Sequence, residues 1–159
     1  MKTVISRRVS TCLGTVAAAT ALAVLPGTAQ AATYDGQDPV SSGCANTAIT
    51  AEQHIITDDA GTTVGWAQLR YSTACRTVWG RVLATSSAWA YGSASVVRNS
   101  DGVVEYIGDP DVTLAWSSAL GEYAAYSPML NDANVTSYAN GCVYNRTISD
   151  EICWDTLSY

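Results

Sequence analysis

Apolar and polar residues alternate along this chain with the period of two that is typical of β-strands, and helical periodicity is hard to find. Clusters of Gly, Asp, Asn and Ser interrupt the alternating runs at intervals of about ten residues. This spacing is typical of small β-sandwiches and barrels. The strands that we expect are 47–57, 62–72, 75–84, 89–98, 103–107, 112–116, 122–126, 135–139, 142–147 and 152–157.

The turn sequences support an antiparallel arrangement. Asp101-Gly102 supplies the positive φ of a tight hairpin turn between two of the expected strands. Residues 58–61 form a similar turn after the first strand, and Asp109-Pro110-Asp111 predicts a break in the chain. We therefore predict an all-β fold, a small antiparallel β-sandwich or barrel.

The first 31 residues follow a different pattern. A basic start precedes an apolar run over 12–25 and then Ala29-Gln30-Ala31, as in a secretory signal peptide cleaved before Ala32. The apolar run is about 14 residues long and falls short of the ~20 that span a bilayer. We expect 1–31 to be removed and 32–159 to form a single secreted domain, monomeric and without a membrane span.

The net charge of the chain limits the kinds of partner that we expect. All 14 acidic residues follow Ala31, whereas only five arginines and no lysine do, so the expected mature chain has a net charge of −9. Such a surface repels phosphate backbones and anionic lipid. Nucleic-acid binding and electrostatic membrane binding are therefore disfavoured.

Four cysteines remain after the expected cleavage, and four allow three connectivities that sequence alone does not distinguish. Proximity along the chain favours Cys44–Cys75, which bracket the first hairpin, and Cys142–Cys153, which flank a plausible turn. A metal site is disfavoured because the chain has one histidine and no Cys-x-x-Cys pair. We expect two disulfides, no metal and no cofactor.

The sequence offers no recognisable catalytic set. His54 is the only histidine, it lies in an alternating run, and no serine occupies a Gly-x-Ser-x-Gly motif. The acidic pairs Asp58-Asp59, Asp109/Asp111 and Asp150-Glu151 lie in expected turns, where Asp is common for backbone reasons. We expect no catalytic residues, and an enzyme of unrecognised type ranks last among the hypotheses.

The aromatic residues provide the one candidate binding patch. The chain has five Trp, nine Tyr and no Phe, a composition shared by many carbohydrate-binding modules. Trp66 and Arg70 share one face of an expected strand, with Trp89 and Tyr91 nearby in sequence. We favour the structural interpretation of these residues, with core packing for the rings and an ion pair of Arg70 with Asp35 or Asp38, over a binding role.

A series of short motifs carries a family resemblance, namely 34–39 (YDGQDP), Gly43-Cys44, 69–72 (LRYS), Cys75 and Trp79. It resembles an actinobacterial family of secreted proteins known as Domain of Unknown Function 2690, over about 34–82. The resemblance implies a secreted β domain with Cys44 paired to Cys75, and it implies no activity.

These observations favour a non-catalytic secreted domain that binds a protein or a glycan at the cell envelope or in the medium. The support is a disulfide-stapled β fold rich in aromatic residues, without a catalytic set. The alternative is an inhibitor of an extracellular hydrolase, a role suited to a small rigid domain.

Overall fold

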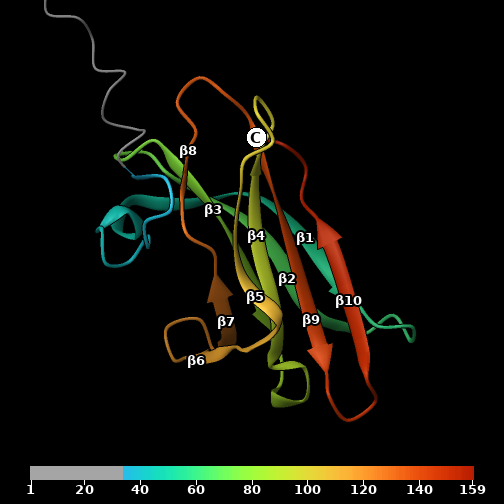
Figure 1. Ribbon diagram of the computed structural model, residues 1–159. Coiled ribbons are helices and arrows are strands. Elements are labelled where there is room, and N and C mark those ends of the chain that lie inside the picture. The colour runs from blue at the N-terminus through green and yellow to red at the C-terminus, as the bar shows by residue number, and fades with distance from the viewer. Residues whose placement is uncertain (1–33) are drawn as a thin grey trace, which may run out of the picture.

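The computed structural model describes residues 34–159, with the side chains of 109–111 left out, and the expected signal peptide lies outside these residues (Figure 1). The described chain forms two antiparallel sheets packed face to face, which confirms the predicted all-β fold. Sheet A has the order β1 (Ala48–Thr57), β2 (Thr63–Ser72), β3 (Thr77–Ala84), β7 (Glu122–Tyr126), β6 (Ala115–Ser117), and β8 (Leu130–Asn131) pairs with the start of β3.

Sheet B has the order β10 (Asp150–Asp155), β9 (Ser137–Asn145), β4 (Tyr91–Arg98), β5 (Val104–Thr113). Two short 3₁₀ helices, η2 (Cys44–Thr47) and η3 (Ser87–Trp89), precede β1 and β4. Among residues 34–159, no helix is long and apolar enough to cross a membrane.

The predicted chain break at 109–111 is wrong, because β5 continues from Val104 to Thr113. Its pairing with β4 is irregular: Ala94 is opposite Ile107, whereas Gly92 is opposite Val112. Extra residues of β5 therefore bulge out of the ladder. Proline is tolerated at such a bulge, and on an edge strand its missing N–H can lie on the unpaired side.

Small residues set the close packing of the two sheets. A Cβ placed on Gly80 of β3 would lie 2.1 Å from the carbonyl oxygen of Ser95 in β4. A Cβ on Gly141 of β9 would lie 2.9 Å from Cβ of Ala67 in β2. The backbones meet closely at these points, and branched side chains fill the space around them. The fully buried ones include Ile56, Leu69, Val78, Val82, Val96 and Val143.

The segment before β1, residues 34–47, is an arm fixed against sheet A. The backbone N–H of Gly36 donates to Met129 O (2.9 Å), and the N–H of Met129 donates to Gln37 O (2.9 Å). Asp35 accepts from the Asn131 backbone N–H. The Cys44–Cys75 disulfide ties the end of the arm to the β2–β3 turn. The arm motifs of the sequence are therefore structural.

Both predicted disulfides are confirmed. Cys44–Cys75 closes a separation of 31 residues, and Cys142–Cys153 joins two directly paired positions of β9 and β10. The first lies buried in a cluster with Trp79 and Met129. It therefore holds the arm against the part of sheet A that carries the candidate site.

Candidate functional site

The outer face of sheet A carries a row of polar and aromatic side chains. Alternation along β2 directs Ala67 and Leu69 into the core, so Trp66, Gln68 and Arg70 project from the opposite face. Pairing with β3 places Arg70 opposite Trp79 and Gln68 opposite Arg81. Trp66 and Arg70 thus share a face, as predicted from the sequence.

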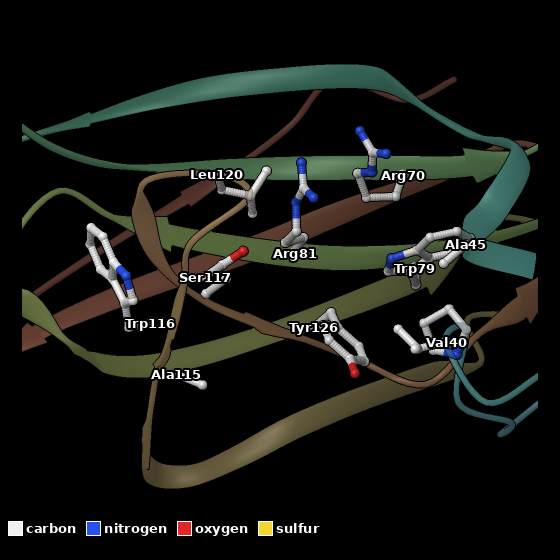
Figure 2. A pocket seen from close by; sticks show the side chains of 12 residues that line it. Val40, Ala45, Arg70, Trp79, Arg81, Ala115, Trp116, Ser117, Leu120 and Tyr126 are labelled. Atoms are coloured by element: carbon white, nitrogen blue, oxygen red, sulfur yellow. The ribbon is translucent and has the colours of Figure 1, made fainter. Parts of the chain in front are cut away.

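A pocket of about 340 Å³ lies on this face. Its floor comes from β2, β3 and β7, one wall from the arm, and the other from the β6–β7 hairpin (Figure 2). We call it the arginine pocket, after Arg70 and Arg81. Its other lining residues are Pro39, Val40, Ala45, Trp79, Ala115, Trp116, Ser117, Leu120, Ala124 and Tyr126.

Arg81 is anchored by a neutral partner. Its Nε donates to Gln68 Oε1 at 2.8 Å and its Nη2 donates to the same oxygen, while the Gln68 amide donates to Gln53 Oε1. Burial, and after it the charge of Arg70, lower the pKa of Arg81 to about 10, although the charge of Glu122 partly offsets this effect. Arg81 therefore remains a cation at neutral pH, although its partial burial raises the free energy of the charged form.

Arg70 is also held by hydrogen bonds to neutral groups, and no carboxylate of the described side chains pairs with it. Its Nη1 donates to Thr50 Oγ1 and its Nη2 donates to Ala48 O at 3.1 Å, and burial lowers its pKa. The predicted pairing of Arg70 with Asp35 or Asp38 is wrong, because Asp35 binds Arg98 at 2.9 Å. Arg98 also pairs with its neighbour Asp101, and these are the only ion pairs in the described part of the chain.

The pocket is unusual because its two arginines form no ion pair with the described residues although the chain is rich in acidic residues. After Ala31 the chain has 14 acidic residues for five arginines, so acids are plentiful. Two half-buried arginines nevertheless lie side by side on one face with no carboxylate within ion-pair distance among the described side chains. Partly desolvated cations of this kind are normally paired.

Trp79 adds a hydrogen-bond donor to the floor. Its side chain is only 3 % exposed, and its indole nitrogen donates to no protein acceptor in the described range. Every fully buried polar side-chain atom of the described residues has a partner, so this nitrogen is not fully buried, and Trp79 lines the pocket. In Figure 2 the indole nitrogen lies on the side of the ring that faces Arg81.

The rim provides an exposed ring. Trp116 on β6 is 57 % exposed, and Tyr123 on β7 packs edge-on against it at 5.1 Å between ring centroids. Leu120, in the β6–β7 hairpin, is also exposed. Trp116 therefore stands at the edge of the pocket, packed on the core-facing Tyr123, whereas Tyr126 is the ring that lies opposite Arg81 on the pocket face.

Of the four predicted patch residues only Arg70 lines the pocket: Trp66 shares its face of β2 but is not a lining residue, and the other two lie elsewhere. Trp89 is 7 % exposed and packs in the core between the sheets. Tyr91 lies on β4 of sheet B, where the Arg146 guanidinium covers its ring at 3.6 Å. Proximity in sequence suggested a common patch for these residues with Trp66 and Arg70, but they belong to different layers of the fold.

Of the twelve lining residues, Arg70 alone was predicted as a binding residue, and the three that matter most to the argument were not. Trp79 and Arg81 are two apart in one strand, so alternation places them on one face, and this pattern was available. Trp116 had no comparable signal, because the pairing of the β6–β7 hairpin with β3 is a long-range contact.

His54 lies apart from the pocket. Its ring stacks on Trp154 of β10 with 4.5 Å between centroids and 11° between planes, joining the edges of the two sheets. It makes no hydrogen bond to a serine or a carboxylate of the described residues. Cys142, Glu151 and Cys153 also lie close together, but both sulfurs are committed to the disulfide.

A family model described as a protein of unknown function (DUF2690) matches residues 32–140, which include the arm and the entire arginine pocket. The match ends before Cys142, so the Cys142–Cys153 staple lies outside it. Comparisons with curated proteins and with solved structures found no match. The matched region covers more than half of the sequence, and the chain belongs to the DUF2690 family.

Proposed function

We propose that this chain is a secreted, non-catalytic binding domain whose ligand site is the arginine pocket. The observation that carries the proposal is the pair of half-buried arginines, Arg70 and Arg81, with no carboxylate of the described side chains within ion-pair distance of either. Desolvating a cation costs free energy that a counter-charge normally offsets. A bound ligand would supply that missing counter-charge.

Secretion is supported by two features. The first 31 residues have the pattern of a signal peptide, and the two disulfides are of the kind that persists in oxidising compartments. The strongly acidic composition suits a protein that remains dissolved outside the cell.

A binding role is favoured over catalysis by the position of His54. A serine hydrolase needs a base within hydrogen-bond reach of its nucleophile. His54 instead stacks on Trp154 at the edge of the sandwich, and the pocket residues Arg70, Arg81 and Trp79 are donors rather than bases. This arrangement suits recognition of a ligand.

The proposal is tested by retention on immobilised cell-wall fragments and on proteins of the culture medium. The full exported chain is compared with Trp116→Ala, which removes an exposed ring and should leave the fold intact, and with Arg146→Met as a control in sheet B. We expect Trp116→Ala to lose most retention and Arg146→Met to keep it. Equal retention by all three proteins would contradict the proposal.

A further inference from the structure

We propose that the arginine pocket binds a sugar that carries one carboxylate, such as a uronic acid unit of a glycan. This inference rests on the function proposed above and names the ligand class. It follows from three properties of the pocket: its unused donors, its position in an acidic protein, and its location on a sheet face.

The unused donors point to an anion. Arg81 Nη1, Arg70 Nε and Trp79 Nε1 donate to no protein group of the described residues. Guanidinium groups match the planar geometry of a carboxylate and bind it with short, charge-assisted hydrogen bonds. A carboxylate would satisfy these donors and neutralise a cation pair that is now unpaired.

The strongly negative net charge of the protein favours a ligand with a single negative charge over a polyanion. The expected mature chain carries −9, so a polymer with a charge on every unit is repelled as it approaches. The positive region is confined to two arginines on one face. An isolated carboxylate on an otherwise neutral glycan fits this distribution, whereas a polyphosphate or a nucleic acid does not.

The sheet face favours a sugar over an extended peptide. Peptides that bind β-sheets commonly add a strand at an edge, where backbone N–H and C=O groups are free. The floor of this pocket is built on β2, β3 and β7, whose backbone groups pair with one another. Recognition must therefore use side chains: the donors of the floor, and the rings of Tyr126 on the floor and Trp116 at the edge, which can stack on the C–H face of a sugar.

The size agrees with a small ligand unit. The pocket volume of about 340 Å³ lies at the low end of the range of roughly 300–1,000 Å³ found for small-molecule sites. The arm and the β6–β7 hairpin bound it on two sides (Figure 2). One or two sugar units can enter it without a rearrangement of the sheet.

The test is calorimetric titration of the full exported chain with methyl β-D-glucuronide. Methyl β-D-glucoside has no carboxylate, acetate has no ring, and inorganic phosphate has neither a ring nor a carboxylate. We expect the glucuronide to bind at least about tenfold more tightly than each of the other three. Equal binding of the glucoside or of phosphate, or no glucuronide binding at about 10 mM, would overturn the inference.

Single substitutions test whether the glucuronide binds in the arginine pocket. Arg81→Met and Trp116→Ala should each weaken glucuronide binding at least about tenfold, and Arg146→Met, which removes the same charge in sheet B, should leave it within about twofold. Unfolding midpoints are measured in parallel. If Arg81→Met fails to fold, Trp116→Ala decides, because its ring is exposed. An equal loss in Arg146→Met would overturn the assignment of the site.

The two proposals fail separately. If the glucuronide does not bind but Trp116→Ala still loses retention on wall fragments, the pocket is a binding site and the carboxylated sugar is wrong. If Arg81→Met and Trp116→Ala both fold and keep both retention and glucuronide binding, the arginine pocket is not the binding site and both proposals are wrong.

Discussion

Arg70 and Arg81 project from neighbouring strands onto one face of sheet A, and the charge of Arg70 lowers the pKa of Arg81. Two like charges held together in a half-buried position weaken the fold unless other contacts compensate. The compensation here is a hydrogen-bonded chain from Arg81 through Gln68 to Gln53.

The hydrogen bonds that link Arg81, Gln68 and Gln53 predict a non-additive effect of a double substitution. Arg81→Met should lower the free energy of unfolding by about 1–3 kcal/mol, because the buried Gln68 Oε1 then lacks a donor. Arg81→Met with Gln68→Leu should recover most of that loss, since both polar partners are then removed. Urea unfolding of the single and double variants measures the coupling, and strictly additive effects would contradict the argument.

The two disulfides should differ in their effect on stability. In the chain-entropy model, the Cys44–Cys75 bridge over 31 residues contributes about 3.7 kcal/mol, and Cys142–Cys153 over 11 residues about 2.8 kcal/mol. The first bridge also fixes the arm that forms one wall of the pocket. We therefore expect Cys44→Ala/Cys75→Ala to lower both stability and ligand retention.

Cys142→Ala/Cys153→Ala is the matched control. It should lower the unfolding midpoint less and leave retention unchanged, because this staple lies on sheet B. Thermal unfolding and the retention assay check both effects. A larger loss of stability in the Cys142/Cys153 variant would show that the loop-length argument is wrong here.

The contact between Gly80 and Ser95 should make Gly80 nearly irreplaceable. Gly80→Ala places a Cβ against backbone, 2.1 Å from Ser95 O, so the sheets must separate; we expect a loss of at least about 3 kcal/mol. Gly61→Ala is the control, because it introduces backbone strain without a steric clash. Gly61 has φ +78° with open space around it, so its loss should be about 1–2 kcal/mol. Similar losses in the two variants would contradict the close approach.

Asp132 should give the fold a dependence on pH. Burial raises its pKa to about 6, against the hydrogen bond from Ser137 and the charges of Arg76 and Arg98, which lower it. The folded state therefore binds the proton more tightly than the unfolded chain does, and stability should fall as pH rises from about 4 to 6. The contribution of Asp132 to this fall should be roughly 1–3 kcal/mol.

Asp132→Asn isolates that contribution. The amide oxygen can still accept from Ser137, but the group no longer ionises. We expect the variant to be at least as stable as the parent at pH 8 and to have a flatter profile between pH 4 and 6. An unchanged slope in urea unfolding over this range would assign the pH dependence to other groups.

Much of the fold was predictable because it depends on local patterns. Alternation and turn residues located β1, β2 and β7 within one or two residues of their observed bounds. Spacing was enough to favour the correct disulfides, since each bridge closes a hairpin. The error at 109–111 arose because a proline that breaks a central strand is tolerated in a bulge on an edge strand, and sequence does not show which strand is at the edge.

The site was predictable only in part. Alternation placed Trp66 and Arg70 together because both lie on one strand. It gave no information on Trp116, whose position depends on the pairing of β6 with β7 and of β7 with β3. The partner of Arg70 was likewise misassigned, because the path of the arm brings Asp35 to Arg98 instead. Long-range register decides both cases.

The central claim is that an anionic ligand binds in the arginine pocket, and the indole N–H signals of the five tryptophans test it most directly. All five lie in the described residues: Trp66, Trp79, Trp89, Trp116 and Trp154. In ¹H–¹⁵N spectra titrated with methyl β-D-glucuronide, we predict that the signals of Trp79 and Trp116 shift, while those of core Trp89 and of Trp154 do not. Shifts confined to Trp89 or Trp154, or no shift at any tryptophan, would contradict the account.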